Sequence, residues 1–228
     1  SATHVYTSAG AKMEGYVASP KGSGKKPVVI IVHDWNGLDA YEKGRADMIS
    51  KLGYIGFAAD IYGQSVRPKD RDESAAQAGK YYGDPKLFRD RLTAAYQAAI
   101  KLPNADPNRV LVMGYCFGGT GALELSRSGA NLVGTASFHG GLKALTPATP
   151  GSVHGRVMVF HASDDPAVSR ADFNGFLDEM RDAKVDLEVH VFNEATHAFT
   201  VPGPMYRERG DKRSWALLTQ FLKEVFRS

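Results

Sequence analysis

The only cysteine of the chain, Cys116, lies in the stretch Gly-Tyr-Cys-Phe-Gly-Gly at positions 114–119. An apolar run at 110–113 precedes it and a helix-like segment at 120–127 follows it, which is the strand, turn and helix context of a nucleophile elbow. The glycines keep Cβ atoms out of a crowded turn whose central residue has a strained backbone. The pattern therefore predicts a cysteine nucleophile at a helix N-terminus, where the helix dipole favours thiolate over thiol.

Two residues farther along the chain could complete a catalytic triad. Asp165 comes after an apolar, strand-like segment at 157–160, and His197 comes after a second one at 189–192. The order nucleophile, acid, histidine is the order found in α/β-hydrolases. In such a triad the histidine accepts the proton of Cys116 and later activates water, while the aspartate fixes the imidazole tautomer and stabilises the imidazolium.

Each of these residues also has an ordinary, non-catalytic interpretation. Cys116 could be a buried, unreactive thiol in a glycine-rich turn, and His197 could be an ordinary loop residue. Asp164 competes with Asp165 for the role of the acid, and we favour Asp165 because it directly precedes Pro166 and a predicted helix. The three residue types, each at the end of a predicted strand and in the required order, favour the triad.

The sequence resembles the dienelactone hydrolase family (carboxymethylenebutenolidases) over nearly its whole length. Besides the elbow, the shared segments are residues 32–38, 59–63, 137–141, 161–166 and 196–199. Members of this family are α/β-hydrolases with a Cys-Asp-His triad, so the resemblance implies that Cys116, Asp165 and His197 form one here. It also implies an oxyanion hole made by the backbone N–H groups of Trp35 and Phe117. In this fold, one oxyanion donor is generally the backbone N–H of the residue after the nucleophile. The other is a backbone N–H in the loop that joins an early strand to a helix.

The match to the family has departures. Where family members carry a glutamate that contacts the resting cysteine, this chain has Asp34, so the resemblance implies a shorter carboxylate that tunes the nucleophile. The family also carries basic residues that bind the substrate's carboxylate. At the matching positions this chain has Ala198 and Ala75, which argues against dienelactone itself as the substrate.

The periodicity of the chain predicts alternating strands and helices, and hence an α/β-hydrolase fold with a mostly parallel central sheet and helices on both faces. We expect one domain covering residues 1–228. Predicted strands lie at 5–6, 13–18, 28–32, 54–59, 110–113, 132–138, 156–160 and 187–192, and predicted helices at 39–52, 85–102, 120–127, 169–183 and 211–226. The polar segment 64–84 is predicted to be an irregular, variable lid over the pocket.

Composition limits the other classes of function. The net charge of +3 over 228 residues is spread over mixed clusters, which does not predict a nucleic-acid surface. No apolar run approaches the roughly 20 residues of a membrane span. The seven histidines show no metal-binding spacing, so we expect neither metal nor cofactor.

A lone cysteine rules out an intrachain disulfide and gives no support for secretion. We expect a cytoplasmic protein, with export left as an alternative because the sequence begins at Ser1.

The leading functional hypothesis is a hydrolase that cleaves a small lactone, ester or thioester through an acyl-cysteine intermediate. The alternatives are a non-catalytic small-molecule receptor and a redox-sensing protein on a hydrolase fold. A complete triad argues against the receptor, and the absence of a second, resolving cysteine argues against an autonomous redox sensor. The expected partner is a small ester or lactone, and the sequence leaves monomer and homodimer equally open.

Overall fold

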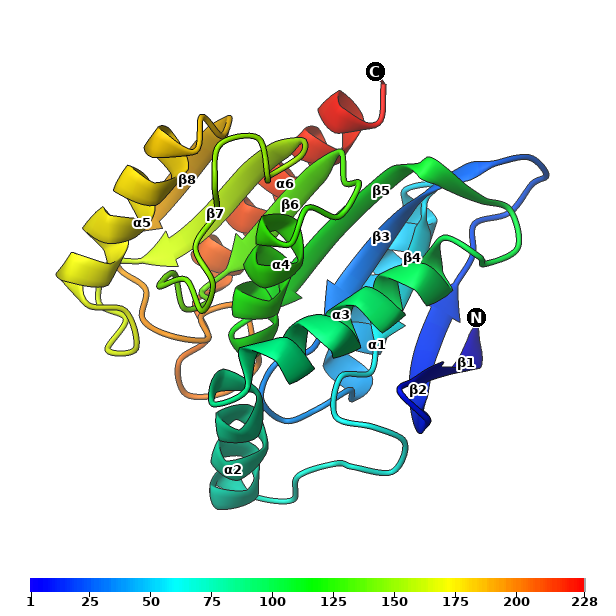
Figure 1. Cartoon of the computed structure of the whole chain (residues 1–228), viewed down its shortest axis with the longest axis horizontal. Helices are drawn as coiled ribbons and strands as arrows, with labels where there is room; N and C mark the ends of the chain where they lie inside the picture. Colours follow the sequence, from blue (N-terminus) through cyan, green and yellow to red (C-terminus); the bar gives the residue numbers. More distant parts are fainter. Residues whose placement is uncertain (228) are drawn as a thin grey trace.

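The computed structural model describes residues 1–227 and contains one eight-stranded sheet (Figure 1). Its strand order is β1-β2-β4-β3-β5-β6-β7-β8. Strands β3 to β8 run parallel to one another, whereas β1 and β2 form an antiparallel hairpin at one edge. The strands are β1 (Ala2–Ser8), β2 (Ala11–Ala18), β3 (Lys26–Val32), β4 (Ile55–Ala59), β5 (Ala105–Tyr115), β6 (Gly134–Phe138), β7 (Arg156–Ala162) and β8 (Leu187–Phe192).

Helices cover both faces of the sheet. In β3 the side chains alternate: Val29 and Ile31 pack with residues of α1 and α6, and Val28 and Ile30 pack with residues of α3 and α4. Because both faces are covered, the inner strands β3 and β7 consist mostly of consecutive buried apolar residues, whereas the edge strand β8 alternates apolar residues with Glu188 and His190. The helices are α1 (Ala40–Lys51), α2 (Arg71–Tyr82), α3 (Pro85–Ala99), α4 (Phe117–Arg127), α5 (Arg170–Asp182) and α6 (Glu208–Val225). The predicted fold class is confirmed.

Three of the helices predicted from the sequence begin after a residue whose side chain caps them. The side chain of Asp39 accepts a hydrogen bond from the Tyr41 N–H and forms a capping box with Glu42, which starts α1. Asp84 caps α3 ahead of Pro85, and Ser169 caps α5. These caps matter for the site because several helices start beside the carboxyl ends of the parallel strands, where the candidate residues lie.

The prediction of an irregular lid at 64–84 is wrong for its second half, which forms the 12-residue helix α2. The side chain of Asp70 caps this helix by accepting the N–H of Glu73. Its inward face carries Ser74, Ala78 and Tyr81, spaced four and three residues apart. The three buried positions have the spacing of a helix, but two of their side chains are small. The sequence therefore shows no strong apolar pattern that would predict this helix. Figure 1 shows α2 standing beyond the end of α3, below the sheet.

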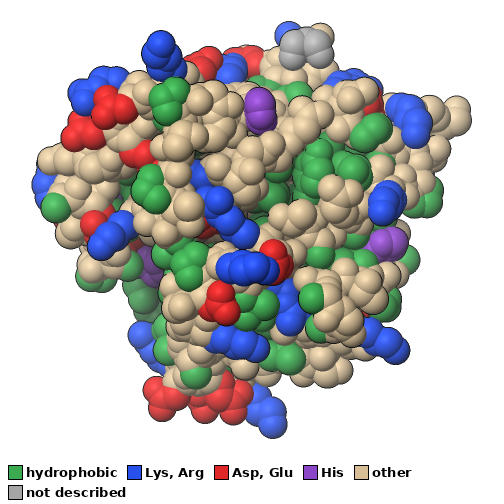
Figure 2. Space-filling view, in the orientation of Figure 1, with side chains coloured by type: hydrophobic (Ala, Val, Ile, Leu, Met, Phe, Trp, Pro, Cys, Tyr) green, Lys and Arg blue, Asp and Glu red, His purple; other side chains and the backbone are tan. Residues whose placement is uncertain are grey.

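The surface is mixed in charge, as the sequence indicates. Figure 2 shows Lys and Arg side chains interspersed with Asp, Glu and hydrophobic side chains over the face seen in Figure 1. None of the helices within residues 1–227 combines the length and the apolar character that a membrane crossing requires. Over the same residues, no group of three or more His, Cys, Asp or Glu side chains could hold a metal ion.

Candidate active site

Cys116 lies at the turn between β5 and α4, and its backbone is strained. Its φ of 56° and ψ of −116° place it in a region that side-chain-bearing residues rarely adopt. The N–H of Cys116 donates to the carbonyl oxygen of Phe138 at 2.9 Å, which anchors the turn to β6. A Cβ at Gly118 would overlap the carbonyl oxygen of Val32, so only glycine lets this turn lie against β3. The structure has the geometry of a nucleophile elbow.

The structure brings the three predicted triad residues together. The Sγ of Cys116 lies 2.8 Å from Nε2 of His197, and Nδ1 of His197 lies 2.8 Å from Oδ2 of Asp165. Because a carboxylate can only accept, the Asp165 contact requires the proton on Nδ1. The Nε2 atom then either accepts from the thiol or, once protonated, donates to the thiolate, which is the arrangement needed for proton transfer between sulfur and imidazole.

Asp165, and not Asp164, is the carboxylate beside the histidine. Asp165 is 4% exposed, and its second oxygen accepts the N–H of Ala167 at 2.8 Å. Asp164 is exposed, and its carbonyl oxygen accepts a hydrogen bond from the Thr196 hydroxyl at 2.9 Å. That bond ties the loop after β7 to the loop after β8, so the carboxylate and the imidazole are held in register.

A buried polar network holds the backbone behind His197. The guanidinium of Arg45 donates to the carbonyl oxygen of Thr200 and pairs with Asp211 at 2.6 Å. The Thr200 hydroxyl is 2.8 Å from the hydroxyl of Tyr41 and 2.8 Å from Nε2 of His139. Arg45 also lies over the ring of Tyr41. Helices α1 and α6 therefore fix the loop that carries the candidate base.

The surroundings of His197 favour its protonated form. Burial disfavours the imidazolium, but the hydrogen bond to Asp165 and the bond and charge of Cys116 outweigh it and raise the pKa of His197 to about 10. The side chain of His197 is 23% exposed and that of Asp165 is fully buried. These interactions favour an imidazolium at His197 beside the sulfur of Cys116.

Two residues of the cavity that holds the sulfur have backbone N–H groups with no hydrogen-bond acceptor among residues 1–227. Phe117 is the first residue of α4, and the first N–H groups of a helix have no partner within it. No hydrogen bond within residues 1–227 has the N–H of Phe117 or of Trp35 as its donor. Trp35 and Phe117 both line the cavity in which Cys116 lies. Their role as the oxyanion hole stays a prediction, and this placement supports it.

Asp34 lines the same cavity, but its carboxylate is engaged within its own loop. One oxygen accepts the N–H of Asn36 at 2.7 Å and the other accepts the side-chain amide of Asn36 at 3.4 Å. Burial raises the pKa of Asp34 to about 6. The sulfur of Cys116 is hydrogen-bonded to His197, so the predicted tuning of the nucleophile by Asp34 would act through charge and remains a prediction.

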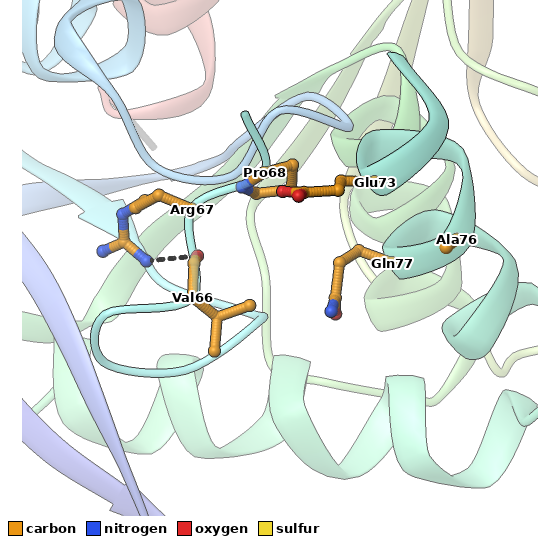
Figure 3. A pocket seen from close by; sticks show the side chains of 6 residues that line it. All are labelled: Val66, Arg67, Pro68, Glu73, Ala76 and Gln77. Carbon is orange, nitrogen blue, oxygen red and sulfur yellow. Dashed lines mark hydrogen bonds between the residues drawn. The ribbon is translucent and has the colours of Figure 1, made fainter. Parts of the chain in front are cut away.

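The cavity around the sulfur has a volume of about 710 Å³, within the size range of small-molecule sites. Its wall is largely apolar, with Leu142, Leu145, Val201 and Met205 among the lining residues. A second, smaller pocket of about 230 Å³ lies beside α2 and contains none of the candidate residues (Figure 3). In Figure 3 the Arg67 guanidinium bonds to the carbonyl oxygen of Val66 on the loop that precedes α2. The chemistry is therefore concentrated in the larger cavity.

A sequence model of the dienelactone hydrolase family matches residues 13–226. The chain belongs to this family. A protein of Aquifex aeolicus provisionally named a carboxymethylenebutenolidase is 27% identical over 225 residues, which cover 94% of each chain. Among solved structures, the dienelactone hydrolase-like promiscuous phosphotriesterase P91 from metagenomic libraries is 32% identical, with a TM-score of 0.92 over 99% of this chain and 98% of its own. A structure named m3DLH is 31% identical, with a TM-score of 0.93 and the same coverage. The protein is thus a hydrolase of the dienelactone hydrolase family.

Several residues of this dienelactone hydrolase family member's cavity were missed by sequence reasoning. Arg71 and Lys143 supply positive charge to the cavity, and Met205 lies on its wall. Arg71 also lies over the indole of Trp35, 5.5 Å from the ring centre. Arg71 is the first residue of the helix that was taken for an irregular lid, so its position could not be assigned. Lys143 lies two residues after segment 137–141, which the sequence shares with the family. This nearness was the only feature of the sequence that could have placed Lys143 at the site.

Proposed function

We propose that this hydrolase cleaves small esters, lactones or thioesters through an acyl-cysteine intermediate, with Cys116 as the nucleophile, His197 as the acid and base, and Asp165 as the residue that orients it. The observation that carries this proposal is the unbroken line of hydrogen bonds from Sγ through both imidazole nitrogens to the buried carboxylate, at 2.8 Å and 2.8 Å. That line lies at a cavity with room for a small substrate.

In the acylation step, the thiolate of Cys116 attacks the carbonyl carbon and a C–S bond forms. Negative charge develops on the carbonyl oxygen, where the N–H groups of Trp35 and Phe117 donate hydrogen bonds. As the tetrahedral intermediate collapses, the imidazolium of His197 gives its proton to the departing oxygen or sulfur. The alcohol or thiol leaves, and the acyl group remains on Cys116 as a thioester.

In the deacylation step, His197 is neutral and acts as a base. Acylation removes the charge of Cys116 and its hydrogen bond, and these are two of the interactions that raise the pKa of His197. The neutral imidazole takes a proton from water, and the hydroxide adds to the thioester carbonyl. The C–S bond then breaks, which releases the carboxylic acid and restores the thiolate. Asp165 keeps the Nδ1 proton in place throughout.

The cavity supports acyl groups that are small and largely apolar. Leu142, Leu145 and Val201 offer aliphatic contacts, whereas Arg71 and Lys143 lie where they can meet a polar or anionic end. Amides are expected to be poor substrates because an amine leaves less readily than a thiolate from the tetrahedral intermediate. Activated esters, lactones and thioesters avoid this problem.

The test is a panel of lactones, aryl esters and acyl thioesters assayed with the wild type, Cys116→Ala and His197→Ala. We expect both substitutions to reduce turnover by a factor of about 1,000 or more, as removal of triad members does in other hydrolases. His154→Ala is the matched control, because His154 is an exposed histidine outside the cavity. Full turnover by Cys116→Ala would refute the proposal.

We also propose phosphotriester hydrolysis as a secondary activity of the same site. The likeness to the promiscuous phosphotriesterase P91 over 99% of the chain supports it, as does a largely apolar cavity suited to an uncharged triester. A p-nitrophenyl phosphotriester assayed with the wild type and Cys116→Ala tests it. Release of p-nitrophenol that does not depend on Cys116 would refute this second activity without affecting the first.

A further inference from the structure

The loop that carries Trp35 joins β3 to α1, and it lies outside any helix or strand. An oxyanion donor is useful only when its N–H is held within a few tenths of an ångström of the position where charge develops. The N–H of Phe117 is held by the first turn of α4. The N–H of Trp35 has no helix behind it. Among residues 1–227, the one main-chain hydrogen bond to its peptide runs from the Gly37 N–H to the carbonyl oxygen of Asp34 at 3.3 Å, so side-chain contacts must supply the remaining support.

His33 is a fully buried histidine at the start of this loop, and it has no part in the triad. Its Nδ1 lies 2.6 Å from the carbonyl oxygen of Asp34, and its Nε2 lies 3.1 Å from the backbone nitrogen of Ile61. The carbonyl oxygen can only accept and the backbone N–H can only donate. The imidazole is therefore neutral, with its proton on Nδ1.

The charge state of His33 agrees with these contacts. Burial lowers the pKa of His33 to about 4, despite the carbonyl of Asp34 and the nearby charge of Asp60. A histidine that stays neutral and keeps both nitrogens occupied does not act as a second general base. It is suited to holding a backbone carbonyl in one direction.

The peptide that His33 holds is the one whose N–H belongs to Trp35. Residues 1–227 contain no cis peptide bonds, and in a trans peptide the carbonyl and the N–H point in opposite directions. Fixing the oxygen of Asp34 on the side of His33 therefore turns the N–H of Trp35 the other way. A hydrogen bond to the carbonyl also polarises the peptide, which makes its N–H a better donor.

The neighbouring peptides are held as well. The carboxyl group of Glu42, which is fully buried, accepts the N–H of Asp34 at 3.1 Å. The hydroxyl of Tyr62 donates to the carbonyl oxygen of Trp35 at 2.9 Å. Each of the three consecutive peptides around Trp35 thus has a hydrogen bond to at least one side chain, and the bond from His33 is on the peptide that carries the free N–H.

We infer that His33 is a positioning residue for hydrolysis: its Nδ1–H fixes the Asp34–Trp35 peptide so that the N–H of Trp35 can stabilise the oxyanion formed at Cys116. The inference rests on the proposed function, since it concerns the same site. It assigns to His33 an effect on the rate of the chemical step, with little effect on substrate binding or on the reactivity of the sulfur.

Two substitutions of His33 separate this role from a merely structural one. In His33→Asn the amide nitrogen can take the place of Nδ1 and donate to Asp34, while the acceptor for Ile61 is lost. In His33→Gln the amide oxygen can take the place of Nε2 and accept from Ile61, while the donor to Asp34 is lost. Each variant loses one buried hydrogen bond, so we expect their thermal midpoints to fall by similar amounts.

The measurements are kcat and KM for a p-nitrophenyl ester and the rate of Cys116 alkylation by iodoacetamide. We expect kcat to fall about 100-fold in His33→Gln, the loss that misplacement of a catalytic group by about 1 Å can cause. His33→Asn should keep most of the wild-type kcat. In both variants KM and the alkylation rate should stay close to wild type, because displacement of iodide forms no oxyanion and needs no such donor.

Tyr62→Phe is a second variant that removes the donor to the Trp35 carbonyl, and it should lower kcat in the same selective way. Tyr96→Phe is its control, since the Tyr96 hydroxyl donates to the carbonyl oxygen of Asn131, which precedes β6 and lies outside the loop. Equal kcat in His33→Asn and His33→Gln would overturn the inference, as would a fall in kcat matched by a fall in alkylation. If a His33 variant does not fold, an unchanged kcat in Tyr62→Phe would overturn it instead.

Cys116→Ala is assayed in parallel to keep the two proposals apart. Hydrolysis that survives in Cys116→Ala overturns the proposed function itself. Hydrolysis that requires Cys116 but not the Nδ1 donor of His33 overturns only the inference about His33.

Discussion

The two candidate oxyanion donors lie in one cavity but are held by different means. The N–H of Phe117 is fixed by main-chain construction: a strained residue at Cys116, a helix that starts directly after it, and glycines at 114 and 118 that let the turn pack tightly. The N–H of Trp35 lies in an irregular loop, which contacts the buried side chains of His33 in the loop itself, Glu42 in α1 and Tyr62 after β4. The position of the Phe117 N–H therefore depends on glycines that have no side chain. The position of the Trp35 N–H depends on buried side chains that form hydrogen bonds to its loop.

This difference predicts opposite sensitivities to substitution. The elbow should tolerate changes of exposed side chains but not a methyl group at its glycines, because backbone atoms occupy the space. The Trp35 loop should instead be sensitive to the loss of a buried polar side chain. Each such side chain is hydrogen-bonded to a main-chain N–H or C=O group of the loop, which would otherwise be buried without a partner.

Gly118→Ala should have the largest effect. Its methyl group would overlap the carbonyl oxygens of Val32 and His33, and backbone cannot move as a side chain can. We expect a loss of about 3 kcal/mol or more in unfolding free energy, together with loss of ester hydrolysis. Gly44→Ala is the control: its Cβ meets nothing within 4 Å in α1, so it should stabilise slightly. Denaturant unfolding that shows Gly118→Ala as stable as wild type would refute this view of the elbow.

Glu42→Ala should have the next largest effect, on the side of the cavity that depends on buried side chains. It removes the acceptor for the N–H groups of Asp34 and Asp39, at a cost of about 1–3 kcal/mol in unfolding free energy. Glu42→Gln keeps one oxygen, and burial already raises the pKa of Glu42 well above its usual range, so a neutral amide should cost less. We expect kcat to fall further in the alanine variant. The reverse order of the two variants in denaturation and kcat would contradict the proposed support of the loop.

Neither oxyanion donor should ionise at high pH, so a fall in activity there reports on the role of His197 as the acid. Both donors are main-chain groups, whereas His197 has a pKa raised to about 10 and is an imidazolium below that value. For an alkyl ester, whose leaving group needs a proton, kcat/KM should fall about tenfold per pH unit above about 10. A p-nitrophenyl ester needs no such proton and should show no comparable fall. Equal pH profiles for the two esters, on protein shown by circular dichroism to remain folded, would exclude His197 as the acid.

The sequence was sufficient for the parts of the site that are contiguous or that follow strands. Cys116 and Phe117 lie in one short motif, and Asp165 and His197 come at strand ends, so the fold class and the triad candidates could be predicted. The sequence was not sufficient for the support of Trp35. His33, Glu42 and Tyr62 each look like ordinary loop, helix and core residues, and only the tertiary structure brings them to consecutive peptides.

The helix α2 was missed for a related reason. Its inward side is made largely of small residues, so neither a strong apolar period nor a turn motif marks it. Arg71 and Tyr82, which stand at its two ends, enter the cavity wall only because the segment is helical. Family resemblance did not help, because the positions at which the family's basic residues are expected hold Ala75 and Ala198 in this chain.

The most direct test of the account is whether an acyl group accumulates on Cys116 when its base is removed. His197→Ala mixed with a p-nitrophenyl ester should gain the mass of one acyl group, because a residual thiolate can still be acylated but no base remains to activate water. Since Cys116 is the only cysteine, digestion should place the adduct on the peptide that contains it. Alkylation beforehand should abolish both the adduct and wild-type turnover. Native-rate turnover by fully alkylated wild-type protein, or an acyl group found on another residue, would contradict the mechanism.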